Sequence, residues 1–181
     1  LCEKKNLGLL VGRLENIYTK DELTGLFNRQ GFKLASTPAV NKAIENKTPI
    51  CAFLFDLDSL KVINDTFGHA EGSFAIQVLA HALENSTDET TICSRWEGDE
   101  FWVLAFDYTP EKAAALMEHV TKYLNHYNKL HSKDYQIQVS CGYCLRIPQT
   151  PDDLTEMFKE ADLNMYAQKR SKDKHIIKGR L

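Results

Sequence analysis

Two kinds of hydrophobic spacing alternate along this chain. Apolar residues three or four positions apart form one stripe on a helix, and this spacing predicts helices over residues 5–19, 29–46, 59–67, 71–83, 110–130 and from 152 or 153 onward. Continuous or alternating apolar runs predict strands over residues 50–57, 90–95, 100–106 and 136–147, with a short final strand over 175–178. A tight turn at 96–99 joins two of these strands into a hairpin. This order predicts an α/β chain of the α+β type, with a mostly antiparallel sheet flanked by helices.

The first predicted helix is set apart from the rest of the chain. Its apolar stripe over residues 5–19 is short, and it fits either the end of a coiled coil that pairs two copies or a helix packed on its own domain. We therefore divide the chain into an N-terminal linker helix at 1–20 and one domain at 21–181. Inside that domain, Pro38 lies within the predicted helix 29–46 and either breaks it or starts a new segment.

Composition narrows the class of protein. The 181 residues suffice for about one domain with its own core, and 43% hydrophobic with 26% charged residues is usual for a globular chain. A net charge of −3 provides no basic field, so we expect no nucleic-acid polymer as a partner. The sequence has no run of 18 apolar residues and no signal peptide, and it begins with Leu1 rather than Met. We expect a cytoplasmic domain of a longer protein, whose sensory domain and any membrane anchor lie upstream.

The five cysteines do not suggest a disulfide framework, because their number is odd and their spacing is irregular. Cys141 and Cys144 spell C-x-x-C, but they lie in a predicted strand, where residues three apart point to opposite faces of the sheet. No second C-x-x-C occurs to complete a zinc site. We therefore expect ordinary buried thiols, which are common in reducing compartments.

Two acidic clusters are the strongest chemical signal in the sequence. Asp56 and Asp58 end the buried strand over 50–57, and Asp99 and Glu100 lie at the hairpin tip. Two carboxylates at neighbouring strand ends can share a hard divalent cation with phosphate oxygens, and the N–H groups of a following helix can bind phosphate. Either cluster alone is more simply explained as solvated turn residues. The pair is more specific, because a buried strand seldom ends in two charges without a partner.

Five segments, in this order along residues 21 to about 178, resemble the motifs of the GGDEF domain. That domain is the nucleotidyl-cyclase module that joins two GTP molecules into cyclic di-GMP, a bacterial second messenger. The segments are Asp21-x-Leu-Thr-Gly-Leu-x-Asn28-Arg29, Phe55-Asp56-Leu-Asp58-x-x-Lys61-x-Ile63-Asn64-Asp65-x-x-Gly68-His69-x-x-Gly72, Arg95-Trp-Glu97-Gly98-Asp99-Glu100-Phe101, Val139-Ser140-x-Gly142 and Ala161-Asp162-x-x-Met165-Tyr166-x-x-Lys169. One such match can arise by chance, but five in sequence are a specific signal.

The resemblance implies a polymerase-palm-like fold and a homodimer whose two domains face each other, each holding one GTP. Asp56 and Asp99, with the Leu57 carbonyl, would bind Mg²⁺ or Mn²⁺. Asp99 and Glu100 would be catalytic, with Glu100 serving the 3′-hydroxyl as a base or a metal ligand, and Asn64 would contact guanine. The other implied substrate contacts are Ser59, Leu60, Lys61, Gly98 and Lys169. The 3′-oxygen of one GTP would attack the α-phosphorus of the other in line, with metal ions neutralising the developing charge and the dimer supplying orientation.

Ser73 departs from the family pattern at the position that contacts the base, where the family usually has Asp. A serine hydroxyl is shorter, and it can donate as well as accept a hydrogen bond. Guanine loses a charge-assisted hydrogen bond worth roughly 1.5–3 kcal/mol, and adenine becomes less excluded. Two hypotheses follow: relaxed base choice that admits ATP and yields cyclic AMP–GMP, or a weakened nucleotide site.

Other departures concern charge and the turn. Glu97 replaces the first Gly of the name-giving motif, which adds a Cβ at a turn and a negative charge beside the phosphates. Asp173 stands where the family usually has a phosphate-binding Arg. The family's product-inhibition motif, R-x-x-D, is replaced by Asp88 and Thr91, so we expect no inhibitory site.

Two functions from different classes therefore stay open. The first is an active diguanylate cyclase, for which Asp56, Asp99 and Glu100 argue. The second is a degenerate domain that binds GTP or dimerises in signalling without turnover, for which Ser73, Glu97 and Asp173 argue. A polymerase fragment is a weaker third reading, because the chain has no basic surface for a template.

Overall fold

A four-stranded antiparallel sheet forms the centre of the computed structural model, which describes residues 17–178, with side chains up to residue 170. The strands are β1 (Ile50–Leu57), β2 (Ile92–Glu97), β3 (Glu100–Phe106) and β4 (Val139–Arg146), and their order across the sheet is β2-β3-β1-β4. β1 pairs with both β3 and β4, so it lies inside the sheet and all eight of its residues are buried. The continuous apolar run over 50–57 therefore predicted its position correctly.

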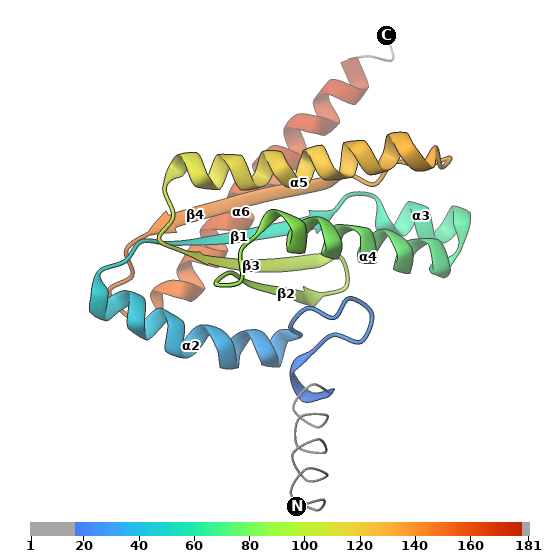
Figure 1. Cartoon of the computed structure of the whole chain (residues 1–181). Helices are drawn as coiled ribbons and strands as arrows, with labels where there is room; N and C mark the ends of the chain where they lie inside the picture. The colour runs from blue at the N-terminus through green and yellow to red at the C-terminus, as the bar shows by residue number, and fades with distance from the viewer. Residues whose placement is uncertain (1–16, 179–181) are drawn as a thin grey trace, which may run out of the picture.

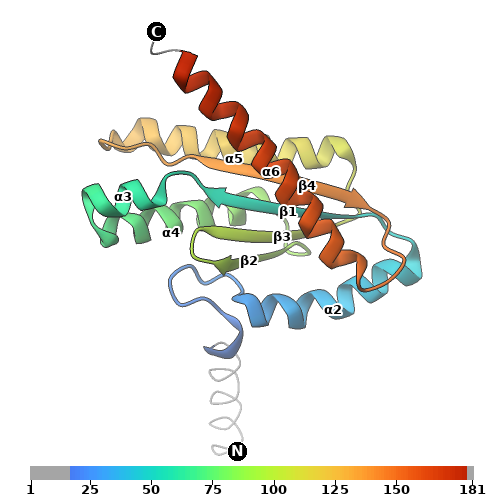
Figure 2. The same cartoon turned by 180° about the vertical axis from the view of Figure 1, so that it is seen from behind.

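Helices cover both faces of this sheet, as Figures 1 and 2 show. They are α2 (Arg29–Asn46), α3 (Leu60–Phe67), α4 (His69–Ser86), α5 (Pro110–His131) and α6 (Asp153–Lys178). α4 and α5 lie over one face, α2 and α6 lie over the other, and α3 extends beyond the end of β1. The α+β architecture expected from the sequence is confirmed.

The strand residues alternate between the two cores. On β1, Phe53 and Phe55 pack with α4 and α5, whereas Ala52 belongs to the cluster that α2 and α6 cover. Cys141 and Cys144 follow the same alternation on β4 and belong to opposite cores, as their spacing predicted. Both are free and buried, and burial raises the pKa of Cys144 to about 11, so this thiol stays protonated and unreactive at neutral pH.

Local signals explain several helix ends. The Thr109 side chain accepts a hydrogen bond from the Lys112 N–H, and Pro110 occupies the first turn of α5, both as predicted. The side chain of Asn28 caps α2 in the same way. Pro38 lies inside α2, which continues past it to Asn46, so this proline neither breaks the helix nor starts a segment.

Several predicted boundaries differ from the structure; α4, for example, covers 69–86 rather than 71–83. β4 begins at Val139 rather than 136, because the backbone of Ile137 pairs with the Asn128 side chain and not with a strand. β2 continues to Glu97, so the hairpin turn is only two residues long. The final strand over 175–178 is wrong: α6 continues to Lys178, because no Gly or Pro interrupts the helical pattern before Gly179.

Two further expectations concern the ends of the chain and membranes. Most of the predicted helix over 5–19 falls outside the described residues, so the hypothesis that it ends a coiled coil stays a prediction. Within the described part of the chain, no helix combines the length and the apolar character needed to cross a bilayer.

The crossing of α6 over β4 depends on Gly142. A Cβ at this position would lie 2.0 Å from the Ala161 carbonyl oxygen and 2.3 Å from the Met165 nitrogen, which are backbone atoms that cannot rotate away. We expect Gly142→Ala to lower the free energy of unfolding by about 1–3 kcal/mol, measured by urea denaturation. Leu163→Ala, at an exposed position of the same helix, should change it by less than about 0.5 kcal/mol. Equal stability of Gly142→Ala and the unchanged protein would contradict this close crossing.

Candidate functional site

The two acidic clusters come together at one end of the sheet. The pairing of β1 with β3 places Asp56 directly opposite Glu100, and the Leu57 N–H donates to the Asp99 carbonyl oxygen at 3.1 Å. Asp56 and Glu100 lie on the face of the sheet that α6 crosses, because their positions alternate with those of Phe55 and Phe101 in the opposite core. The sequence predicted this convergence from the strand ends, and the register produces it.

Burial and mutual repulsion raise the pKa of two of these carboxyl groups. The Asp56 side chain is almost fully buried, and this desolvation is the main cause of its raised pKa, with smaller contributions from the charges of Asp99 and Asp58. Burial also raises the pKa of Glu100, and the charges of Asp56 and Asp99 raise it further. Such a site favours a bound cation, which relieves the repulsion.

A lysine from α6 already contributes one cation. The Lys169 Nζ donates to Asp56 Oδ1, and this contact opposes the rise in the pKa of Asp56. Lys169 was predicted to contact phosphate, but the structure places it on a predicted metal ligand. The two positions are compatible only if the long side chain changes partner when nucleotide binds.

The oxygens near this point suit a hard divalent cation. Among the described residues, no three His, Cys, Asp or Glu side chains form a ready-made metal cluster. Asp56 and Asp99 provide two carboxylates, and the Leu57 carbonyl is next in sequence to Asp56. Mg²⁺ commonly takes one or two carboxylates and completes its shell with water and phosphate oxygens, so an incomplete protein shell is what such a site requires.

Asp58 has a different environment from Asp56. Its Oδ1 accepts a hydrogen bond from the Ser140 hydroxyl at 2.7 Å, and its N–H donates to the Gln138 carbonyl oxygen at 2.8 Å. Asp58 therefore ties the end of β1 to β4. Of the two acids that end the predicted strand, the structure places only Asp56 against Lys169.

The predicted phosphate contacts lie immediately after β1. Ser59 has a left-handed φ of 61°, which turns the chain from the strand into α3. The N–H groups of the first helical turn, beginning at Leu60, have no acceptor within the helix. Lys61 is exposed in this turn, so its ammonium group and the turn can face the same anion.

The predicted base contacts lie on the paired helices α3 and α4, Asn64 on the first and Ser73 on the second. Gly72 is buried, and a Cβ there would lie 1.9 Å from the Asn64 Oδ1, so the Asn64 side chain lies directly against the α4 backbone. Ser73 follows in the same turn and is half-buried. The structure thus places Asn64 against the residue that precedes Ser73, on helices rather than on the sheet that carries the acids.

The hairpin tip requires glycine at position 98 but not at position 97. Gly98 has a φ of +50°, which suits the first residue of the two-residue turn. Glu97 is the exposed last residue of β2, pairs with Glu100, and is absent from the described non-glycine residues with positive φ. The Cβ of Glu97 therefore causes no backbone strain, and its negative charge is what distinguishes it from glycine.

Arg95 was missed as a site residue, although the motif includes it. Its Nε donates to the Gly98 carbonyl oxygen at 2.8 Å, and its Nη1 lies 3.3 Å from Asp21 Oδ2. Arg95 thereby ties the hairpin tip to the turn that opens the domain. The signal in the sequence was the presence of both Asp21 and Arg95 in matched motifs, but their pairing depends on the fold.

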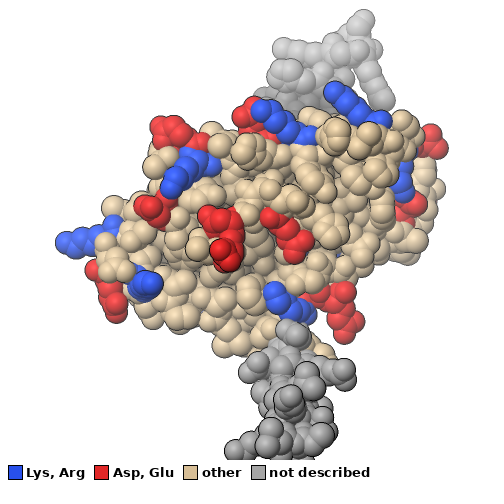
Figure 3. All heavy atoms as spheres, viewed as in Figure 1, with Lys and Arg blue, Asp and Glu red and all other residues tan. Residues whose placement is uncertain are grey.

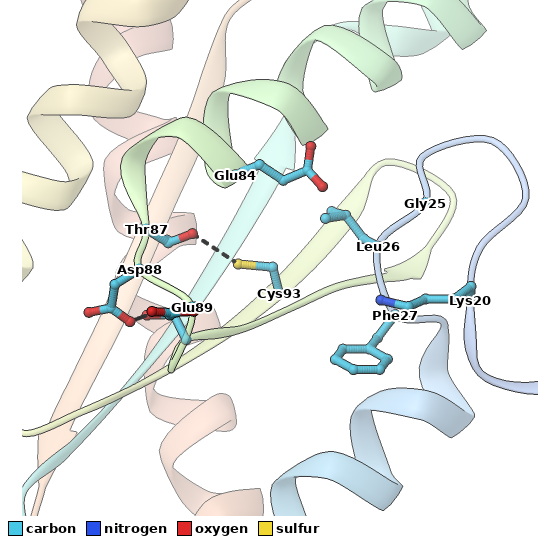
Figure 4. Close-up of a pocket in the computed structure, with 10 residues that line it drawn as sticks. Lys20, Gly25, Leu26, Phe27, Glu84, Thr87, Asp88, Glu89 and Cys93 are labelled. Atoms are coloured by element: carbon cyan, nitrogen blue, oxygen red, sulfur yellow. Dashed lines mark hydrogen bonds between the residues drawn. The ribbon is translucent and has the colours of Figure 1, made fainter. Parts of the chain in front are cut away.

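The region of the replaced inhibitory motif forms a small pocket with an acidic rim (Figure 4). Its lining includes Glu84, Asp88 and Glu89, while the Lys20 Nζ lies 3.9 Å from the Phe27 ring centroid. Asp88 accepts hydrogen bonds from Thr90 and Thr91 and so closes its own turn. The side chain of Asp173 lies outside the described residues.

Charges on the surface are mixed. On the face shown in Figure 3, Lys and Arg alternate with Asp and Glu, and no continuous basic track is visible over the described residues. On this face the distribution agrees with the low net charge and shows no path for a long polyanion.

A family model described as "Diguanylate cyclase, GGDEF domain" matches residues 18–175. The chain belongs to the GGDEF family. The GGDEF match includes both acidic clusters, the α3–α4 pair and Lys169, so the resemblance found in the five motifs is confirmed. The matched region begins near the end of the predicted linker helix at 1–20 and ends six residues before the last residue, Leu181.

Relatives and solved structures agree with this GGDEF assignment. The probable diguanylate cyclase DgcJ of Escherichia coli K12 is 34% identical over 160 residues, which is 88% of this chain and 30% of that protein. The probable diguanylate cyclase DgcT of the same strain is 37% identical over 106 residues, 59% of this chain and 23% of that protein. This chain thus spans less than a third of the length of either relative.

Among solved structures, the coiled coil and GGDEF domain of DgcB from Caulobacter crescentus, in complex with c-di-GMP, has a TM-score of 0.81 at 25% identity. The superposition covers 94% of this chain and 90% of that one. The GGDEF domain of FimX from Pseudomonas aeruginosa has a TM-score of 0.74 at 20% identity, which shows a shared fold alone. The sheet order and its flanking helices are therefore those of a GGDEF domain.

The raised pKa of Glu100 leads to a prediction about stability. Above the raised pKa of the folded state, Glu100 is charged in both the folded and the unfolded protein, and its charge lowers the stability of the fold. Below the ordinary pKa of about 4.3, Glu100 is protonated in both states and this loss of stability disappears. At pH 7 with EDTA and no nucleotide, we expect Glu100→Gln to raise the melting temperature, because the amide has no charge to desolvate or to be repelled by Asp56 and Asp99.

The difference should shrink as the pH falls toward about 4, where the carboxyl becomes neutral. Glu89→Gln, at an exposed position, is the control and should leave the melting temperature unchanged. A lower melting temperature for Glu100→Gln at pH 7 would show that this carboxylate stabilises the fold.

Proposed function

We propose that this domain is the catalytic part of a diguanylate cyclase, which condenses two GTP molecules into cyclic di-GMP in a homodimer. The observation that carries the proposal is the convergence of Asp56, Asp99 and Glu100 beside the first turn of α3. The names of the relatives support the same reaction class. An upstream sensory domain in the complete protein would control this output.

Asp56 and Asp99, with the Leu57 carbonyl, are the proposed ligands of Mg²⁺ or Mn²⁺. All three groups offer oxygen atoms, which these ions prefer. Asp56 already has a cationic partner in Lys169, so a positive charge at this carboxylate suits the site. When bound, the ion neutralises charge on the phosphates in the transition state.

The protein side chains orient the two nucleotides and move one proton. Glu100 accepts the proton of the 3′-hydroxyl, and its raised pKa makes it a stronger base than an exposed glutamate. The first turn of α3, from Ser59 through Leu60 to Lys61, binds the phosphates through N–H groups and an ammonium group. Gly98 leaves the hairpin tip open for their close approach.

Lys169 completes the phosphate contacts by changing partner. In the structure its ammonium group neutralises Asp56. A bound cation repels this ammonium, and the triphosphate offers it a nearby anion. Lys169 therefore links occupation of the carboxylates to binding of the nucleotide.

Base choice depends on Asn64 and Ser73. The Asn64 amide can donate to and accept from a purine edge, while the Ser73 hydroxyl can adapt to either role. A hydroxyl that donates or accepts does not exclude adenine as a carboxylate does. We therefore include ATP as a second substrate and cyclic AMP–GMP as a second product.

The ion pair between Lys169 and Asp56 also favours a second function. Lys169 holds a proposed metal ligand, and Glu97 adds a negative charge at the hairpin tip. If the cation and nucleotide do not displace Lys169, the domain binds GTP weakly and signals by dimerisation without turnover. The acidic rim around Asp88 would also disfavour feedback by an anionic dinucleotide at that position.

Product identity distinguishes the two functions. We expect the dimeric protein with Mg²⁺, GTP and ATP to form cyclic di-GMP and cyclic AMP–GMP, identified by mass spectrometry. Asp99→Asn keeps the size of the side chain and should reduce both products by about 100-fold or more, because it removes a metal ligand. A folded, dimeric protein that binds GTP but forms no product would support the non-catalytic function.

Ser73→Asp tests the base contact separately. A carboxylate restores the charge-assisted acceptor for guanine and repels the acceptor N1 of adenine, so we expect the preference for GTP over ATP to rise about 10- to 100-fold, as 1.5–3 kcal/mol implies. The measurement is the ratio of kcat/KM for the two nucleotides. Ser86→Asp places the same charge at the far end of α4 and should leave this ratio unchanged. An unaltered ratio in Ser73→Asp would remove residue 73 from the base site.

A further inference from the structure

A loop that follows α5 contacts both helices of the proposed base site. Tyr135 in this loop donates from its hydroxyl to Glu71 Oε2 at 2.5 Å, and the Lys133 Nζ bonds to the same oxygen. Glu71 lies in the first turn of α4, immediately before Gly72 and Ser73. One carboxylate next to the base-contact turn thus receives two donors from a distant part of the chain.

The same two loop residues also make aromatic contacts. The Tyr135 ring packs against Phe67 of α3 with ring centroids 5.1 Å apart, and the Lys133 Nζ lies 4.1 Å from the ring centroid of Phe74 on α4. Lys133 and Tyr135 therefore hold the end of one helix and the beginning of the next at the same time. We refer to Glu71, Lys133 and Tyr135 as the loop clamp.

The loop is itself held in place at its far end. Asn128, a buried residue of α5, accepts from the Ile137 N–H and donates to the Ile137 carbonyl oxygen, both at 2.9 Å. The next residue, Gln138, accepts from the Asp58 N–H at 2.8 Å. The clamp is thus anchored to α5 and to the strand end that carries Asp56.

The clamp differs from an ordinary surface ion pair, which contributes little. The side chains of Glu71 and Lys133 are 36% and 28% exposed, so solvent is partly excluded. Hydrogen bonds from Lys133 and Tyr135 lower the pKa of Glu71, which keeps it charged near neutral pH. A charged carboxylate with two donors and two flanking aromatic contacts restrains the direction of α4 more than a single exposed pair does.

The direction of α4 matters because it sets the spacing between Asn64 on α3 and the turn of α4 that contains Gly72 and Ser73. The Asn64 side chain lies against Gly72, with no space for even a Cβ between them. Glu71 is the adjacent residue, so a shift of Glu71 moves Gly72 and Ser73 relative to Asn64. An altered spacing of these two groups changes which purine edge they fit.

We propose that Lys133 and Tyr135, acting through Glu71, are positioning residues that set the purine selectivity of the Asn64–Ser73 site. This inference rests on the proposed function, since it assigns a support to the proposed base site. Neither residue contacts the nucleotide. They hold the α3–α4 pair in the geometry in which guanine is preferred.

Three variants test this role while preserving size. Tyr135→Phe keeps the ring on Phe67 but removes the donor, Glu71→Gln removes the charge, and Lys133→Met keeps an apolar stem over Phe74. We expect each to raise the KM for GTP about 3- to 10-fold, to raise the KM for ATP less, and to change kcat less than about twofold. Glu118→Gln, which breaks an exposed ion pair with Lys122 elsewhere on α5, is the matched control and should change neither KM.

The double variant Glu71→Gln/Tyr135→Phe examines whether the residues act as one unit. Its effect on the KM for GTP should not exceed that of the larger single variant, because both substitutions remove the same support. Melting temperatures of all variants should stay within a few degrees of the unchanged protein. A drop in stability with an unchanged ratio of the two KM values would show that the clamp is only structural, and would overturn the inference.

Equilibrium binding of GTP and of ATP, each with Mg²⁺, distinguishes failure of the inference from failure of the proposed function. Clamp variants that bind both nucleotides like the unchanged protein overturn the inference alone. An unchanged protein that binds neither nucleotide overturns the proposed function, and the clamp with it. An unchanged protein that binds GTP without forming product still supports the inference if the clamp variants lose affinity for GTP more than for ATP.

Discussion

The pairing of β1 with β3 is the constraint on which the site depends. It places Asp56 opposite Glu100 and brings the Asp99 backbone to the N–H of Leu57. Because the strand end is buried, the carboxylates of Asp56 and Glu100 are poorly solvated, and nearby carboxylates repel them. Burial, and to a smaller extent this repulsion, raises the pKa of both groups. The rest of the sheet and the helix α6 hold this unfavourable arrangement, and Lys169 offsets part of it.

The departures from the family pattern affect this site in different ways. Glu97 occupies a conformation that any residue can adopt, so its substitution for glycine alters charge and not the shape of the hairpin. Ser73 is half-buried in the first part of α4, and its hydroxyl has a different hydrogen-bonding capacity from the carboxylate that the family usually has at this position. The residues proposed to bind metal and phosphate therefore follow the family pattern, while a proposed base contact and a charge at the hairpin tip depart from it.

The residues proposed for the chemistry and those proposed for recognition of the base belong to different layers of the molecule. The carboxylates belong to the sheet, whereas Asn64 and Ser73 belong to a helix pair that extends beyond it. The later part of α4 packs on the sheet, and the loop clamp adds contacts to the end of α3 and the beginning of α4. Under the proposal, variation in this loop would change base selectivity without disturbing the carboxylates of the sheet.

The sequence by itself determined the identity of most elements, the family and the acids at the strand ends. These are local features: the apolar run over 50–57, the cap at Thr109 and the order of motifs need no knowledge of distant contacts. It could not predict the Lys169–Asp56 pair, the Arg95–Asp21 pair or the clamp on Glu71, since the partners lie far apart along the chain. It also predicted a strand where α6 continues, because a short apolar pair at the chain end fits either structure. Only the tertiary structure decided these contacts, because strand register and helix crossing bring together residues whose separation in sequence carries no signal of their pairing.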